Sequence, residues 1–369
     1  MTRDFSEIKR LAEQGDSTAQ NTLGRMYSKG QEVEQNIFEA VHWYKRSADQ
    51  GNVNGIFNLA MCYYNGKGIP QDFDEAFTLF EEAARRGSAS AANSLGNCYY
   101  NGNGVSKNYK EAIVWYKKAI EKENAAAYNN LANCFYYGNG IERDYAEAFS
   151  LYKKAAEMDN AFAQLHIANC YFFGEGTEED ESEAVKWYIK AAEQGIPEAQ
   201  FRLGDCYYEG TGISKDEEEA VKWFRKAAYA EYAEAQDALG DCYYLGHGTD
   251  QNFAEAVTWY RRALANGFVD TMSKLGSCYY GGIGVDVDED EAYSLFSKAA
   301  ERGDDSAEFG LGECYANGVG VAENMDRAIF WYEKAVEHGN VSAMIALAEC
   351  YENGIGVRQD MLRLLKCIH

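Results

Sequence analysis

Nine cysteines recur at one fixed spacing and are the first residues that could carry chemistry. They lie 36 residues apart, at Cys62, Cys98, Cys134, Cys170, Cys206, Cys242, Cys278, Cys314 and Cys350, and only Cys367 falls outside the series. Thiolates can bind zinc, sense oxidants or attack a substrate, but each role needs further ligands or a base, and this spacing supplies neither C-x-x-C nor C-x-x-H. We therefore expect these cysteines to be small apolar residues packed between helices.

A G-x-G step follows each of the nine cysteines, as at Gly102 and Gly104. A phosphate-binding loop would occur once, between a strand and a helix, with a third glycine or a Lys-Ser/Thr pair. A step that recurs nine times instead predicts a helix C-cap in the left-handed conformation, followed by a tight turn.

The other candidate sites are weaker. Asp286, Asp288 and Asp290 are spaced like calcium ligands, but the glycine at the sixth place and the glutamate at the twelfth are missing. The five histidines share no position in the 36-residue pattern, and no Ser/His/Asp or Cys/His arrangement stands out. The sequence thus predicts no catalytic residue, no metal site and no cofactor.

Two helices in each 36-residue unit account for this spacing. Ala91, Leu95 and Tyr99 lie at i, i+4 and i+8, which predicts one apolar face of a helix over residues 89–101. We call this helix A. Helix B follows the G-x-G loop and begins at an Asn or Asp with Glu three residues later, as at Asp72 and Glu75, a pattern that predicts a capping box.

The units form one uninterrupted array. We predict a single continuous domain over residues 1–369 that begins within a B helix at about 4–14, contains ten A helices and ends in a truncated or divergent B helix at 361–369.

The charge of the chain excludes some partners. The formal net charge is -24, with 18 basic against 25 acidic residues in 1–180 and 17 against 34 in 181–369. Such a protein repels the phosphates of nucleic acid and anionic membrane surfaces. The sequence shows neither a secretory signal nor 18 consecutive apolar residues, so we expect a soluble, cytoplasmic protein without membrane insertion.

The repeated pattern A-x-x-x-L-G-x-C-Y-x-x-G-x-G-V-x-x-D-x-x-E-A-x-x-W-Y-x-K-A-A-E-x-G resembles the Sel-1-like repeat family over residues 4–360. The resemblance implies an all-α fold, a right-handed superhelical solenoid of ten 36-residue helix-turn-helix repeats, whose concave wall is lined by the A helices. It also implies an adaptor that gathers other proteins. A cysteine-rich branch bridges its helices with two cysteines per repeat. Here there is one, and stacked helices lie about 8–10 Å apart, too far for a disulfide, so reduced thiols are expected.

The resemblance also points to a binding surface. In related repeats the residue that follows the Leu-Gly pair faces the concave groove, together with residues about one turn before and after it. Amides there can bond to the main chain of an extended segment, aromatic rings supply contact area, and carboxylates select Lys or Arg. The candidate residues are Asn93, Asn97, Tyr100, Asn129, Asn133, Tyr136, Asn169, Phe172, Asp205, Tyr208, Asp241 and Tyr244.

These residues are also what a solvated helix face carries, so other readings stay open. The principal hypothesis is a non-catalytic scaffold that binds a protein partner, in the form of an extended segment with Lys or Arg, and that is itself a monomer. One alternative is a regulatory subunit that docks on an enzyme and activates it. Another is a hydrolase of the β-lactamase-like type proposed for cysteine-rich relatives, which would need a nucleophile and a base side by side.

Overall fold

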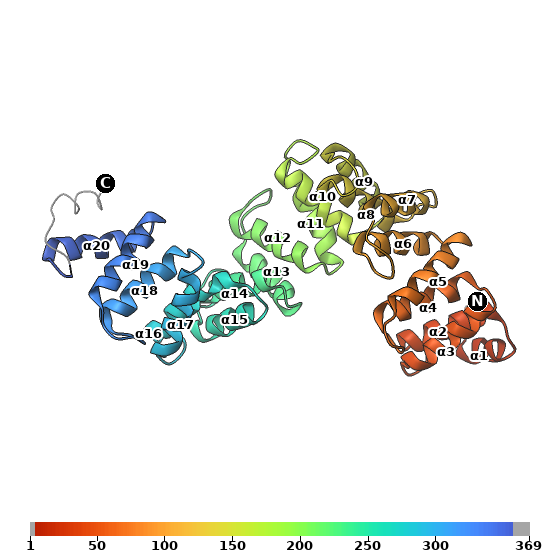
Figure 1. Cartoon of the computed structure of the whole chain (residues 1–369), viewed down its shortest axis with the longest axis horizontal. Helices are drawn as coiled ribbons and strands as arrows, with labels where there is room; N and C mark the ends of the chain where they lie inside the picture. The colour runs from red at the N-terminus through yellow and green to blue at the C-terminus, as the bar shows by residue number, and fades with distance from the viewer. Residues whose placement is uncertain (1–3, 357–369) are drawn as a thin grey trace. The chain divides into compact units, whose positions relative to one another are not determined.

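The computed structural model describes residues 4–356, so the last predicted B segment, 361–369, lies outside the described residues. Over this range the regular elements are twenty α-helices and one 3-10 helix, η1 (Val269–Thr271), without a strand (Figure 1). The A helices are α2 (Ser17–Lys29), α4 (Val53–Asn65), α6 (Ala89–Asn101), α8 (Ala125–Tyr137), α10 (Ala161–Phe173), α12 (Pro197–Glu209), α14 (Ala233–Leu245), α16 (Met272–Gly281), α18 (Asp305–Asn317) and α20 (Val341–Asn353).

The B helices alternate with them along the chain. They are α1 (Phe5–Glu13), α3 (Ile37–Asp49), α5 (Phe73–Arg85), α7 (Tyr109–Ile120), α9 (Tyr145–Glu157), α11 (Glu181–Glu193), α13 (Glu217–Tyr229), α15 (Phe253–Ala265), α17 (Glu289–Ala300) and α19 (Met325–Glu337). The predicted all-α architecture of paired helices is confirmed, and helix A of the third unit has the predicted bounds, 89–101.

The helices fall into two compact units that meet in sequence between Asp180 and Glu181. Unit 1 contains α1 to α10, and unit 2 contains α11 to α20. Within each unit, an A helix packs against the B helix that follows it and the B helix that precedes it. That the whole chain forms one continuous solenoid stays a prediction.

The core lies between the A and B helices and is built from small residues on one side and aromatic residues on the other. In unit 1, Ala91, Leu95 and Cys98 of α6 are buried against Phe80 and Ala83 of α5. All nine cysteines of the 36-residue series are buried free thiols. Burial raises the pKa of the Cys98 thiol to about 12, so it stays protonated and unreactive. Their predicted role as packing residues is confirmed.

The glycines of the G-x-G step have separate roles. Gly102 ends α6 in the left-handed conformation, with φ of 82°, and its N–H donates to the carbonyl of Cys98. Gly104 also has positive φ, and a Cβ there would lie 2.1 Å from the carbonyl oxygen of Phe73, at the start of α5. The first glycine is therefore the predicted cap, and the second allows the loop to pass close to a neighbouring helix.

The predicted capping box is only half formed. Asp72 caps α5 as expected, because its Oδ1 atom accepts a hydrogen bond from the N–H of Glu75 at 3.0 Å. The N–H of Asp72, which Glu75 should satisfy in a capping box, donates instead to the carbonyl of Tyr63 at 3.0 Å. The same bond joins Asn108 to the carbonyl of Tyr99 at 2.8 Å. The end of helix A therefore fixes the start of helix B directly, and the glutamate is not needed for it.

Candidate binding surface on the A helices

The residues that directly follow the Leu-Gly or Leu-Ala pair of helix A lie next to the following B helix, and in several repeats a tyrosine of that helix holds them. We call these residues the central column. Asn97 Oδ1 accepts a hydrogen bond from the Tyr116 hydroxyl at 2.8 Å. In each case the tyrosine lies 19 residues after its acceptor. The same bond joins the Tyr152 hydroxyl to Asn133 at 2.6 Å, the Tyr260 hydroxyl to Asp241 at 2.8 Å, and the Tyr332 hydroxyl to Glu313.

Burial of the tyrosine explains why the central column is polar. Tyr116 is only 2% exposed, and a buried phenol needs an acceptor for its hydroxyl. Six of the 36-residue repeats carry Tyr at this place of helix B, and their central residues are Arg25, Asn97, Asn133, Asn169, Asp241 and Glu313. Three repeats carry Phe instead, and their central residues are Met61, Asp205 and Ser277. A comparison of residues 19 apart could have revealed this pairing from the sequence.

A second contact comes from the following A helix, from the residue directly before its leucine. We call these residues the bridging column. In unit 1, Asn130 Nδ2 donates to Asn93 Oδ1 at 2.9 Å and to Asn97 Oδ1 at 3.0 Å. Asn130 was not among the predicted residues, because its role depends on side chains 33 and 37 positions away. The amides on α6 and α8 thus form one connected network.

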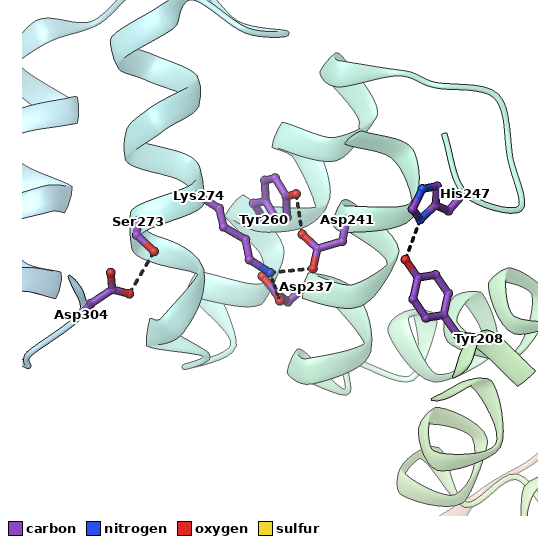
Figure 2. A network of polar contacts seen from close by, with 8 residues as sticks. All are labelled: Tyr208, Asp237, Asp241, His247, Tyr260, Ser273, Lys274 and Asp304. Atoms are coloured by element: carbon purple, nitrogen blue, oxygen red, sulfur yellow. Dashed lines mark hydrogen bonds and ion pairs between the residues drawn. The ribbon is translucent and has the colours of Figure 1, made fainter. Parts of the chain in front are cut away.

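An ionic version of the same bridge lies in unit 2 (Figure 2). Lys274 Nζ lies 2.7 Å from Asp237 Oδ2 and 2.6 Å from Asp241 Oδ2, while the Tyr260 hydroxyl bonds to the other oxygen of Asp241. Burial acts to lower the pKa of Lys274, but the carboxylates of Asp237 and Asp241 outweigh it and raise the pKa. The ammonium also lies 5.7 Å from the centroid of the Tyr260 ring.

A cleft of about 340 Å³ opens beside this ion pair, and Asp241, Tyr244, Lys274 and Ser277 line part of it. The ammonium group of Lys274 therefore already places a cation at this cleft. Asp241, which we predicted to select a Lys or Arg of the partner, is already paired with Lys274 of the chain itself.

Asp205 differs from Asp241 and Glu313, two other acidic residues of the central column, which each accept a hydrogen bond from a tyrosine hydroxyl. Its B-helix counterpart is Phe224, which has no hydroxyl, and its bridging counterpart is Ala238, which has no donor. Asp205 is half-buried and receives no hydrogen bond or ion pair from the described residues. Burial raises the pKa of Asp205 to about 6, although Arg202 acts to lower it and Glu209 to raise it further.

The predicted aromatic residues are anchored to the loop of the following unit. The Tyr100 hydroxyl accepts a hydrogen bond from Asn139 Nδ2 at 2.7 Å, and the Tyr136 hydroxyl donates to Glu175 Oε2 at 2.5 Å. The Tyr208 hydroxyl lies 2.6 Å from Nδ1 of His247 (Figure 2). Because each ring is held at its hydroxyl, it presents a fixed edge to the surface.

The remaining predicted residues are placed less uniformly. The ring of Phe172 packs edge-on against Phe173 at 5.0 Å, and the ring of Tyr244 packs against Phe253 at 5.2 Å. Asn169 is half-buried. Asn129 is only 7% exposed, and its Oδ1 atom has no hydrogen-bond partner in the described structure. Its side chain is mostly covered by the fold, and its place on the candidate surface stays a prediction.

The family model of the Sel1 repeat matches the sequence along nearly the whole chain. It covers ten consecutive segments, at residues 17–52, 53–88, 89–124, 125–160, 161–196, 197–232, 233–268, 269–304, 305–340 and 341–363. The chain belongs to the Sel1 repeat family.

Solved structures of other Sel1 repeat proteins are similar to this one. A protein described as a protective antigen of uropathogenic Escherichia coli with an SLR fold is 31% identical, with a TM-score of 0.64, over 97% of this chain and 85% of that chain. A Sel1 repeat protein from Oxalobacter formigenes is 36% identical, with a TM-score of 0.59, over 65% of this chain and 95% of that chain. No protein with a curated description matches the sequence.

The repeats and the solenoid fold support a protein-interaction scaffold, and a Sel1 repeat solenoid is generally non-enzymatic. Within residues 4–356 of this Sel1 repeat protein, no three His, Cys, Asp or Glu side chains are grouped as metal ligands would be. None of the helices in that range combines the length and the apolar character needed to cross a membrane.

Proposed function

We propose that this Sel1 repeat protein binds an extended segment of a partner protein along its A helices and catalyses no reaction. The observation that carries the proposal is the state of the central-column amides. Asn97 and Asn133 use their Oδ1 atoms for internal hydrogen bonds, whereas their Nδ2 groups donate to none of the described residues. Two donors on neighbouring A helices are thus oriented and available.

The spacing of these donors suits an extended chain. Adjacent packed helices lie roughly 8–10 Å apart, and an extended peptide rises about 3.3 Å per residue. Donors on successive A helices could therefore meet different carbonyl groups of one extended segment of the partner. Because Tyr116 and Tyr152 already fix the two amides, little side-chain entropy is lost on binding.

The proposal also includes a reducing, cytoplasmic environment and a monomeric state. The nine buried thiols of the described chain are free, which suits a compartment that keeps cysteines reduced. The partner is a protein and not nucleic acid, because a net charge of -24 repels phosphate backbones.

The test uses variants that retain the internal bonds. In Asn97→Asp/Asn133→Asp, the carboxylates still accept from Tyr116 and Tyr152, as Asp241 does from its tyrosine, but both free donors are lost. Unstructured 12-residue peptides would be selected from a displayed library on the wild-type protein, and their affinities measured by fluorescence anisotropy. We expect the double variant to bind at least about tenfold more weakly.

The matched control is Lys117→Gln/Lys153→Gln, which changes the net charge by the same amount at exposed positions of α7 and α9. It should leave the affinities unchanged. Equal binding by the wild-type protein and the Asn97→Asp/Asn133→Asp variant would refute the proposed surface.

A further inference from the structure

Asp205 lacks the side-chain donors that surround the equivalent residue, Asp241, in the next repeat. In the next 36-residue repeat, three groups surround the carboxylate of Asp241: the Tyr260 hydroxyl, the Lys274 ammonium and the second carboxylate of Asp237. The corresponding residues around Asp205 are Phe224, Ala238 and Phe201. The carboxylate is retained, while the hydroxyl, the ammonium and the second carboxylate that surround it in the following repeat are each replaced by an apolar group.

The occupied site shows what the open site can hold. At Asp241, a lysine side chain lies along the A-helix face, with its ammonium against the carboxylate and beside an aromatic ring (Figure 2). At Asp205, Ala238 removes that lysine, while Phe224 retains the ring beneath it. Phe201, in place of Asp237, offers an apolar surface for the methylene groups of an entering side chain.

The charges near Asp205 do not fill this place. Arg202 is on the same helix but forms no ion pair with Asp205, and Glu209 lies one turn beyond Asp205 and adds negative charge. The Tyr208 hydroxyl is bonded to His247 and not to the carboxylate. Asp205 therefore remains an accessible acceptor on the A-helix surface of unit 2.

We propose that Asp205 receives the ammonium or guanidinium group of a Lys or Arg side chain of the bound segment, in the position that Lys274 takes against Asp241. The inference rests on the proposed function, because it assigns one residue of the partner that the A helices bind. It also changes the predicted site: Asp205 is open to a cation, whereas Asp241 is already occupied.

The first experiment needs no partner. In Ala238→Lys, the new side chain should place its ammonium against Asp205, and carbon-13 NMR should show the pKa of Asp205 falling by at least about one unit, a tenfold change in the proton affinity. Ala238→Met, which is also long but uncharged, should not lower it. An unchanged pKa in a folded Ala238→Lys protein would show that the place does not accept an ammonium group and would overturn the proposal.

The second experiment uses the peptides selected on the wild-type protein. We expect one position to be enriched in Lys or Arg, and replacing that residue by Gln should weaken binding to the wild-type protein at least about tenfold. The same replacement should change binding to Asp205→Asn less than about twofold, while the matched variant Glu193→Gln, exposed on α11, should behave as wild type.

The outcomes separate the two proposals. Peptides that depend on Asn97 and Asn133 but show no Lys or Arg preference linked to Asp205 would overturn this inference and leave the proposed function intact. If no selected peptide depends on any A-helix residue, the proposed function fails, and the assignment of Asp205 to a partner fails with it.

Discussion

Replacement of Asp205 by Asn should stabilise unit 2 at neutral pH, which is unusual for a polar residue in a folded protein. Burial raises the pKa of Asp205 from its ordinary value of 3.8 to about 6. Each pKa unit corresponds to about 1.36 kcal/mol, so the ionised carboxylate costs the folded state about 2–3 kcal/mol above pH 6. Asn has nearly the same shape and carries no charge, so it should remove that cost.

The pH dependence follows from the direction of the shift. Because the folded pKa lies above the unfolded one, the folded protein binds more protons between pH 4 and pH 6, and its stability falls as the pH rises through that range. Asp205→Asn should therefore match the wild type near pH 4 and exceed it by about 2–3 kcal/mol at pH 7.

Amide hydrogen exchange in α12 and α13 measures this difference locally, which suits an array of repeats. Phe224→Tyr provides a companion variant, since its hydroxyl would donate to Asp205 and should recover about 1 kcal/mol at pH 7. An Asp205→Asn protein that is no more stable than wild type at pH 7 would refute the reasoning, because the carboxylate would then have a favourable partner in the fold.

Three further predictions concern unit 1. Burial lowers the pKa of His166 to about 4, below its ordinary 6.5, so stability should fall by about 2–3 kcal/mol as the pH drops from 6.5 to 4. His166→Gln should abolish that fall in urea unfolding curves, and a retained fall would assign it to other groups. Tyr116→Phe removes the hydroxyl that bonds to Asn97 and should cost about 1 kcal/mol by hydrogen exchange in α6 and α7, whereas no change would mean that water replaces the bond. Glu123 has a φ of 54°, where the equivalent turn before α6 has Gly87, so Glu123→Gly should raise the free energy of unfolding by about 0.5–1 kcal/mol; a lower value would show that Glu123 is not strained.

The sequence was sufficient to predict the features that recur in every 36-residue repeat. The apolar periodicity predicted the helix at 89–101. The recurrence of the G-x-G step indicated that its first glycine is a helix cap and not part of a phosphate-binding loop. It was insufficient for contacts between helices. The second half of the capping box failed because a carbonyl nine residues earlier competes for the same N–H, which a local pattern does not reveal.

The candidate site shows the same division. The candidate residues of the central column came from the family resemblance, but the internal partners of Asn97 and Asp241 lie 19 and 33 residues away in sequence. Those partners decide what each residue can offer. They leave only the Nδ2 donor of Asn97 available, and they pair the carboxylate of Asp241 with Lys274. The family resemblance suggested the candidate surface, which stays a prediction, and the contacts between helices decide which of its atoms are available.

The instability at Asp205 and its proposed role in binding have one physical cause. A carboxylate without a donor is costly in the free protein, and a cation from the partner removes that cost. Binding should therefore lower the pKa of Asp205 from about 6 and release a proton when the complex forms near that pH. Affinity for a peptide that contains Lys should increase as the pH rises from 5 to 7, and calorimetry in buffers of different ionisation enthalpy should detect the released proton. Asp205→Asn should show neither effect. Because Arg202 and Glu209 also lie near the carboxylate, a pH dependence that persists in Asp205→Asn would assign the proton to another group.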